Sequence, residues 1–135
     1  MPLTFHPTTG TIVVCDYGTG FVAPEMVKVR PVVIISPRFR SRPGLCTVVP
    51  LSSTEPAPME RYHHRLSAAA YPPARGPMWA KCDMLATVSL ARLDRLKVRG
   101  AGGKREYLTF LMPPDDMAAI QVCIRFALGL VDKQP

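Results

Sequence analysis

Runs of apolar residues dominate the first half of the chain and predict β-strands. The runs are residues 11–16, 29–36 and 45–51. They are rich in β-branched side chains, which pack well on a pleated surface. Pro37 stops the second run and Gly44 precedes the third, so residues 37–44 are expected to form a hairpin connection that carries exposed arginines.

Three weaker extended runs follow in the second half of the chain. They are residues 62–66, 78–84 and 105–112. The Ala- and Pro-rich segment 67–77 is typical of a loop, and the glycines of segment 100–103 predict a flexible turn. Ser89 is placed to cap a short helical turn that reaches Arg92.

The pattern changes to helical spacing near the C-terminus. The recurring apolar residues are Met117, Ile120, Ile124, Ala127 and Leu128. They predict an amphipathic helix that begins with two acids, which the helix dipole favours there, and ends at Gly129. The strand connections are too short for βαβ crossovers. We therefore expect one domain over residues 1–135, mainly β, with short antiparallel strands in a small, strongly bent barrel or pair of sheets and a C-terminal α-helix on one side.

Composition narrows the class of protein further. With 47% hydrophobic and 20% charged residues, the chain has the composition of a folded protein rather than a disordered one. No apolar run approaches the roughly 20 residues that cross a bilayer, and the first residues do not resemble a signal peptide, so we expect a cytoplasmic protein without a membrane partner. Cysteines stand at positions 15, 46, 82 and 123, without metal-ligand spacing. Free, mostly buried thiols, no metal site and no cofactor are expected.

Basic residues are concentrated in two segments. The formal net charge is +7, from 17 Lys and Arg against 10 Asp and Glu. Residues 28–42 hold basic side chains and no acid, and residues 92–105 hold a single acid among many bases. Such clusters attract polyanions by releasing counterions, which indicates RNA, DNA or an acidic protein segment as partners. A basic surface that is merely solvated explains the charge equally well.

Three segments together resemble the MazF/PemK/Kid toxin family in order and spacing. They are residues 10–16, 28–37 and 48–54. The most specific piece is the pair Arg30-Pro31, which opens a β-branched strand that ends in Ser36-Pro37. Residues 81–85 are similar to a later strand of the family. The resemblance implies an SH3-like barrel of the CcdB/PemK type, usually a homodimer. It also implies metal-independent, sequence-selective cleavage of single-stranded RNA through attack of a 2′-hydroxyl, and neutralisation by a cognate antitoxin, which we expect to be acidic.

The resemblance also implies roles for residues of the second and third strands. Arg30 stands where the family has its catalytic arginine, and the permanent charge and fork of a guanidinium suit two phosphate oxygens. Ser52 falls where the family commonly has a threonine that holds the scissile phosphate. Ser53 or Thr54 takes this role if the register is shifted.

Two further catalytic candidates lie in the run 78–84. Asp83 matches a carboxylate that acts as base in one branch of the family, and Lys81 stands where that branch has an arginine as proton donor. Alternation places both on one face of the expected strand, either beside one phosphate or as a surface ion pair. The same alternation points His63 and His64 to opposite faces. The candidates to contact RNA are Lys28, Arg38, Arg40, Thr54 and His64.

Two other functions fit the same residues. A CcdB-like poison would use the same fold to bind a protein target such as gyrase without catalysis. A degenerate member of the family would act only as a nucleic-acid-binding module. Arg30 with a hydroxyl in the next strand favours catalysis, whereas the departures at Ser52 and Lys81 keep the other two functions open.

Overall fold

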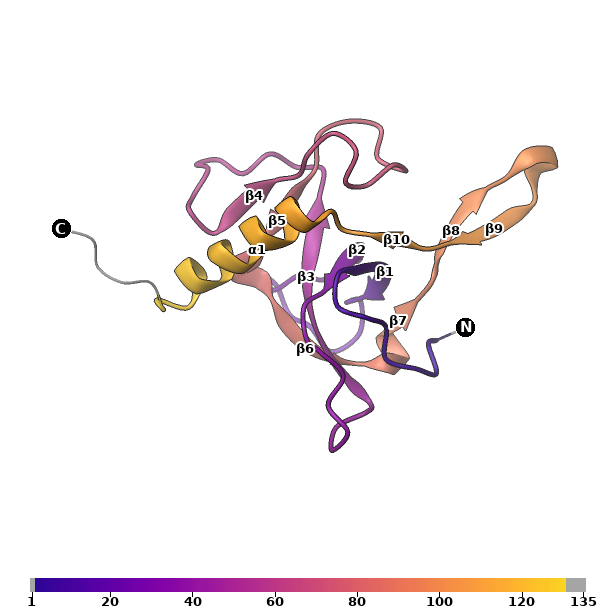
Figure 1. Ribbon diagram of the computed structural model, residues 1–135, viewed down its shortest axis with the longest axis horizontal. Coiled ribbons are helices and arrows are strands. Elements are labelled where there is room, and N and C mark those ends of the chain that lie inside the picture. Colours follow the sequence, from indigo (N-terminus) through magenta and orange to yellow (C-terminus); the bar gives the residue numbers. More distant parts are fainter. Residues whose placement is uncertain (1, 131–135) are drawn as a thin grey trace.

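The structure is a computed structural model that describes residues 2–130, and it is mainly β with one α-helix (Figure 1). The strands are β1 (Thr11–Asp16), β2 (Val29–Ile34), β3 (Leu45–Ser52), β4 (His63–Arg65), β5 (Trp79–Lys81), β6 (Ala86–Ser89), β7 (Leu93–Asp94), β8 (Leu96–Arg99), β9 (Arg105–Leu108) and β10 (Phe110–Leu111). Three 3-10 helices span Cys82–Met84, Leu90–Arg92 and Ala101–Gly103, and α1 spans Pro114–Ala127. The predicted fold class is confirmed.

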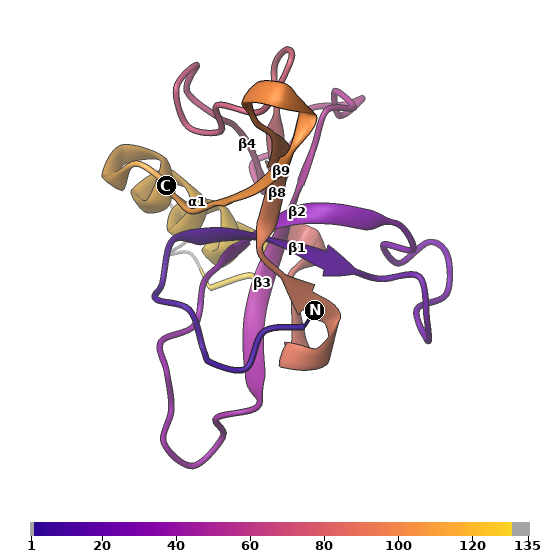
Figure 2. The ribbon, with the colours of Figure 1, turned by 90° about the vertical axis from the view of Figure 1, so that its right-hand side faces the viewer.

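Strands β1, β2 and β3 form the centre of an antiparallel sheet with the order β10-β1-β2-β3-β5-β4. On their edges away from β2, β1 also pairs with β7 and β3 also pairs with β6. The 3-10 helix Leu90–Arg92 joins β6 to β7, so the sheet curls round without closing. In Figure 2, β3 runs steeply across β1 and β2, which shows the strong twist. The structure is therefore the bent sheet that was expected, with the barrel left open between β6 and β7.

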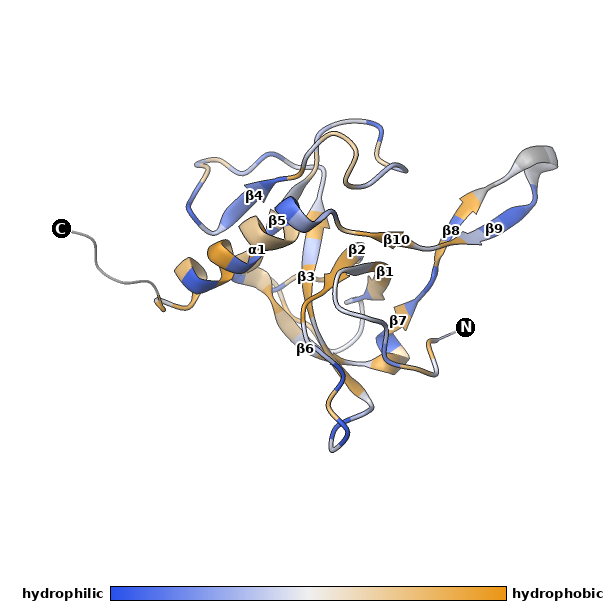
Figure 3. Cartoon of the chain, in the orientation of Figure 1, coloured by the Kyte–Doolittle hydropathy of each residue, from blue (hydrophilic) through white to orange (hydrophobic). Residues whose placement is uncertain are grey.

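Both faces of the central strands are buried. Successive side chains of a strand point to opposite faces. The first core includes Ile12, Val33, Val49 and Leu51 of the sheet with Ile120 of α1. The second core includes Val13, Cys15, Val32 and Val48 with Val88 of β6 and Leu93 of β7. Burial on both faces explains why these strands are continuous apolar runs rather than alternating ones (Figure 3).

Helix α1 follows the prediction closely. Pro114 occupies the first turn, where the missing N–H of proline has no cost, and two acids follow it. Ile120 and Cys123 are buried, while Val122 is exposed, so one stripe of the helix covers the first core. Gly129 then takes a positive φ of 69°, the usual way to end a helix. The predicted cap of the short turn before β7 is also confirmed, because Ser89 Oγ accepts the Ala91 N–H at 3.1 Å.

The second half of the chain differs from the prediction at three places. The strand expected over residues 78–84 ends at Lys81, where the backbone turns into a 3-10 helix. Strands β6, β7 and β8 were not predicted. The run expected over residues 105–112 is two strands, because β9 pairs with β8 whereas β10 pairs with β1. Strands this short show little periodicity, and their tertiary partners decide where they begin and end.

Strands β8 and β9 form a separate two-stranded sheet that projects from the body at the upper right of Figure 1. We call residues 95–108 the arm. It is anchored by Leu96, which is buried in the first core. Its tip contains Gly102 and Gly103, both at positive φ, and the chain turns where a turn was predicted.

The four cysteines are free and buried, as predicted. Burial raises the pKa of both Cys15 and Cys46 to about 11, which makes these thiols poor nucleophiles. Within residues 2–130, no helix is long and apolar enough to cross a bilayer.

Candidate functional site

Arg30 lies near the start of β2, beside the loop 17–28 that follows β1. It is partly buried and pairs with Cys15 across the sheet. Tyr17 continues this register, because its N–H donates to the Lys28 carbonyl at 3.4 Å. Alternation therefore places Cys15, Tyr17 and Arg30 on one face of the sheet, the face of the second core. Tyr17 and Arg30 are diagonal neighbours there, a separation that long side chains bridge.

The loop after β1 is held by polar contacts of its own. Asp16 Oδ1 accepts the Gly18 N–H at 2.7 Å, which forms a tight Asx turn. From the other side, Arg92 Nη1 donates to the Asp16 carbonyl at 3.1 Å, and its guanidinium carbon lies 4.7 Å from the centre of the Phe21 ring. The loop is thereby fixed against the 3-10 helix that joins β6 to β7.

Ser52 ends β3 on the same face as Arg30. The β2–β3 ladder closes with the pair Val32 and Pro50, and Arg30 and Ser52 each lie two residues beyond it. Ser52 is only 3% exposed, and its Oγ accepts the Thr54 N–H at 3.1 Å. Accepting this bond leaves the hydroxyl able to donate its hydrogen to another acceptor. Thr54 lies in the exposed turn that follows, so Ser52 is the candidate hydroxyl that β3 aligns with the arginine.

Two buried donors on this face lack a strong hydrogen-bond partner within residues 2–130. Nε of Arg30 has none, and the hydroxyl of Tyr17 has only the weakly accepting Cys15 thiol beside it. Burial, with a smaller contribution from Cys15, raises the pKa of Tyr17 far above its ordinary value, so the phenol stays protonated. A buried donor without an acceptor costs about 1–3 kcal/mol and is uncommon in native proteins.

The structure contradicts the shared strand face expected for Lys81 and Asp83. Strand β5 ends at Lys81, and Asp83 lies in the 3-10 helix Cys82–Met84, where period-two alternation does not hold. The Asp83 side chain is 42% exposed, and its Oδ1 is 3.9 Å from His63 Nε2, too far for a hydrogen bond. Lys81 pairs with His63 through the backbone of β4. The prediction was wrong because a short extended run does not reveal where the backbone leaves the strand.

Asp83 lines a cleft of about 500 Å³ between the loop after β1 and residues 83–86. Tyr17 and Phe21 form part of the opposite wall. Arg30 and Ser52 do not line this cleft, although the structure describes both residues. Tyr17 belongs to both the cleft wall and the arginine face, so the two surfaces adjoin at this residue.

The basic residues expected to contact RNA are spread over both ends of the sheet. Lys28 is exposed two residues before Arg30. Arg38 and Arg40 are exposed in the connection between β2 and β3, at the bottom of Figure 2, away from the loop after β1 at the right. A strand of six residues spans about 20 Å. The structure therefore does not bring Arg38 and Arg40 to Arg30.

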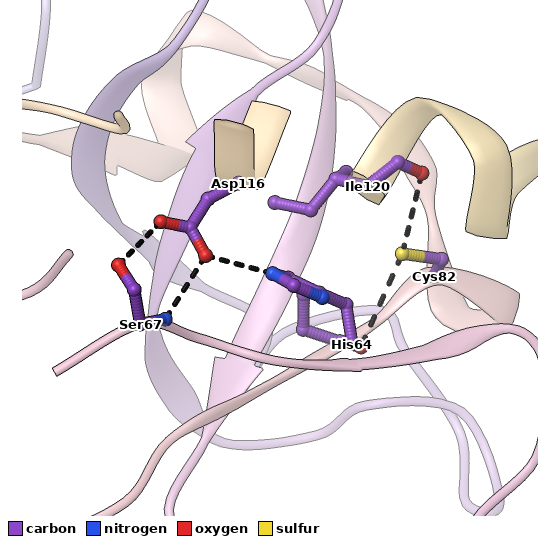
Figure 4. A network of polar contacts seen from close by, with 6 residues as sticks. His64, Ser67, Cys82, Asp116 and Ile120 are labelled. Atoms are coloured by element: carbon purple, nitrogen blue, oxygen red, sulfur yellow. Dashed lines mark hydrogen bonds and ion pairs between the residues drawn. The ribbon is translucent and has the colours of Figure 1, made fainter. Parts of the chain in front are cut away.

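His64 lies in a network beneath the N-terminus of α1 (Figure 4). Its Nε2 is 2.7 Å from Asp116 Oδ1, and Ser67 donates its hydroxyl to Oδ2 at 2.6 Å and its N–H to Oδ1 at 3.0 Å. Burial would raise the pKa of Asp116, but the hydrogen bonds from Ser67 and His64 outweigh it and hold this pKa below its ordinary value. We call these three residues the clasp. It joins β4 to α1 on the face of the first core, opposite the Arg30 face.

The sequence did not single out Tyr17 or Asp116. A signal for Tyr17 was present, because it continues the positions of Val13 and Cys15 on one face of β1. Asp116 was expected only as an acid that suits the helix dipole, and nothing local pairs it with His64. Within residues 2–130, no three His, Cys, Asp or Glu side chains come together as metal ligands would.

Comparisons with known proteins place this geometry in context. Residues 8–128 match the family described as PemK-like, MazF-like toxins of type II toxin-antitoxin systems. The chain is 28% identical to the uncharacterized protein YifN of Escherichia coli over 148 aligned positions, which cover 90% of this chain and 91% of YifN. A mycobacterial endoribonuclease solved in complex with its cognate antitoxin has a similar structure, with a TM-score of 0.66 and 22% identity over 95% of this chain and 100% of that one. MazF from Deinococcus radiodurans gives a TM-score of 0.65 and 18% identity over 91% and 96% of the two chains.

Proposed function

Because this chain belongs to the family of PemK-like and MazF-like toxins of type II toxin-antitoxin systems, we propose that it is an endoribonuclease that cleaves single-stranded RNA at the Arg30 face. The observation that carries the proposal is the buried Nε of Arg30, a cationic donor without a partner in residues 2–130. A phosphodiester supplies the negative acceptor oxygens that such a group lacks. The endoribonucleases with a similar structure support the same conclusion.

The proposed reaction is attack of a ribose 2′-oxygen on the adjacent phosphorus, with departure of the 5′-oxygen of the next nucleotide. Asp83 takes the proton of the 2′-hydroxyl, and Lys81 or water returns a proton to the leaving oxygen. Arg30 neutralises the charge that grows on the phosphoryl oxygens, and Ser52 donates a hydrogen bond to one of them. The products are a 2′,3′-cyclic phosphate and a 5′-hydroxyl. A guanidinium supplies the charge that a metal ion supplies in other nucleases, so we propose that no metal is needed.

The test is to incubate the purified protein with a defined single-stranded RNA in excess chelator and to map the new ends. We expect cuts that carry 2′,3′-cyclic phosphates. Arg30→Ala should slow cleavage by at least about 100-fold, because an electrostatic group at the reacting phosphate is lost. Arg125→Ala is the matched control, since it removes one exposed positive charge from α1 on the other side of the sheet.

Two results would overturn the proposal. One is intact RNA after incubation with the wild-type protein, with or without chelator, which would favour a poison that binds a protein target. The other is equal cleavage by Arg30→Ala and Arg125→Ala, which would show that Arg30 is not the phosphate cation.

The remaining expectations form part of the same proposal. A formal net charge of +7 and exposed cations at both ends of the sheet suit an acidic antitoxin that covers the RNA-binding surface. We also propose that the protein forms a homodimer and acts in the cytoplasm, where its RNA substrate is found. An antitoxin complex that dissociates at high salt but not at low salt would support the electrostatic part.

A further inference from the structure

We propose that one face of the arm is a second RNA-binding surface, which holds single-stranded RNA outside the Arg30 face. The inference rests on the proposed function only for the identity of the ligand. Its own evidence is the register, the charge and the exposed aromatic ring of strands β8 and β9.

The register of the arm separates its side chains into two unlike faces. Leu96 pairs with Leu108, and Val98 pairs with Glu106. On the alternate positions, Lys97 pairs with Tyr107, and Arg99 pairs with Arg105 along the backbone. The side chain of Arg99 lies outside the described residues. The face of Lys97, Arg105 and Tyr107, which we call the cationic face, is turned away from the residues that anchor the arm through Leu96.

Tyr107 is the centre of the cationic face. It is 47% exposed, so the ring is accessible to a ligand. The guanidinium carbon of Arg95 lies 4.3 Å from the centre of this ring, and Nζ of Lys97 lies 5.4 Å from it. These contacts hold the ring and the two cations together as one preformed surface.

Two acidic side chains lie in or beside the arm, one off the cationic face and one at its base. Glu106 belongs to the other face and packs over Gly100, where a Cβ would collide with its carboxyl group. Asp94 lies at the base of the arm, with Oδ2 3.9 Å from Nζ of Lys97. Arg105 is exposed farther along, toward the tip. Positive charge therefore outweighs negative charge on the cationic face, and this excess favours an anionic ligand.

The combination of cations with an exposed ring favours RNA over an acidic peptide. Single-stranded nucleic acids bind by stacking bases on aromatic rings and guanidinium planes, while neighbouring cations contact the phosphates. An acidic peptide would use the charges but would leave Tyr107 without a role. The arm also projects from the body as a hairpin. A hairpin contacts an extended RNA chain along its length more easily than it contacts a compact partner.

The test measures binding without cleavage. The probe is a fluorescein-labelled oligouridine whose 2′-oxygens are methylated, so that it has no attacking hydroxyl, and its affinity is followed by fluorescence anisotropy over a range of salt concentrations. Arg105→Ala should reduce the slope of log affinity against log salt by about 0.7, the value for one phosphate contact on a single strand. Tyr107→Ala should weaken binding about tenfold, and Tyr107→Phe should restore it, because stacking needs only the ring.

Lys104→Ala is the matched control, because it removes an exposed positive charge from the neighbouring position, which alternation places off the cationic face. Its salt slope should equal that of the wild type. The inference would be overturned if Arg105→Ala and Tyr107→Ala bound the probe as Lys104→Ala does while circular dichroism showed that both variants are folded. The inference would also be overturned if these two variants lost affinity for polyglutamate but kept their affinity for RNA. That result would assign the face to an acidic protein.

The failure of this inference is distinguishable from the failure of the proposed function. If the wild-type protein leaves RNA intact while probe binding still depends on Arg105 and Tyr107, only the proposed cleavage is refuted. If the wild-type protein cleaves RNA while both arm variants bind the probe normally, only the role of the arm is refuted. Arg30→Ala should keep most of the arm-dependent binding, because Arg30 lies outside the arm.

Discussion

Asp116→Asn tests whether the clasp stabilises the fold. Asp116 is 3% exposed and accepts hydrogen bonds from His64 and from both the hydroxyl and the N–H of Ser67. Asparagine keeps the shape and one acceptor oxygen but removes the charge, and it turns an NH₂ group toward donors. A hydrogen bond to a charged group is worth about 1.5–3 kcal/mol, roughly twice a neutral one. With three such bonds weakened together, we expect the free energy of unfolding to fall by about 2–4 kcal/mol.

The assay is urea unfolding at neutral pH, with Asp115→Asn as the control. Asp115 is exposed in the same first turn of α1, so both substitutions remove the same favourable charge from the helix N-terminus, worth about 0.3–1 kcal/mol. The difference between the two variants isolates the clasp. Equal unfolding free energies for Asp115→Asn and Asp116→Asn would refute the reasoning, because the buried network would then contribute nothing beyond the helix dipole.

The dependence on pH gives a second measurement of the same contact. The pKa of Asp116 lies below its ordinary value of 3.8 in the folded protein. A carboxylate with a lowered folded pKa contributes stability that is complete above its unfolded pKa and is lost as the pH falls through the folded pKa. The advantage of the wild type over Asp116→Asn should therefore persist at neutral pH and shrink below about pH 4.

Three more predictions address the site and the cores. Ser52→Ala should slow RNA cleavage by at least about tenfold while Thr54→Ala changes it little, and the reverse order in a cleavage assay would move the phosphate-binding hydroxyl to the turn. Tyr17→Phe should raise the free energy of unfolding by up to about 1 kcal/mol, because it removes a buried hydroxyl whose neighbour is only the weakly accepting Cys15 thiol; a clear loss in urea unfolding would mean that the hydroxyl is satisfied. Cys15 and Cys46, whose pKa values of about 11 follow from burial, should resist a thiol reagent at pH 8 until denaturant is added, and fast labelling of the folded protein would contradict their burial.

The sequence predicted the elements whose pattern is long and locally encoded. The strands around Val13, Val32 and Val48 and the helix around Ile120 carry uninterrupted runs or helical spacing, so their identity does not depend on partners. The strands β6 to β8 are two to four residues long, and only pairing with β1, β3 or β9 defines them. Arg30 could be chosen from its motif, but its unpartnered Nε depends on the packing of the whole sheet.

The candidate site shows the same limit. Lys81 and Asp83 would share one face only if the strand were continuous. A 3-10 turn begins at Cys82, so the alternation rule does not apply to Asp83. Alternation correctly separated His63 from His64, yet the partner of His64 is 52 residues away in the sequence. Contacts of this range depend on how α1 docks on the sheet, which no local pattern contains.

The two faces of the sheet separate the stabilising clasp from the proposed active site, and Arg30→Ala makes this separation measurable. The clasp and α1 cover the first core, whereas Arg30 lies on the face of the second core, so the two groups share no hydrogen bond among the described contacts. A buried donor without a partner opposes folding by about 1–3 kcal/mol. Removing the guanidinium should therefore leave the free energy of unfolding unchanged or raise it, less the small loss from the packing of the aliphatic part of the side chain. RNA cleavage should be lost. Asp116→Asn should show the converse, with normal cleavage at a temperature where the variant is folded. If Arg30→Ala lowered the stability as much as Asp116→Asn does, Arg30 would belong to the structural framework, and its unpartnered nitrogen would not indicate a phosphate.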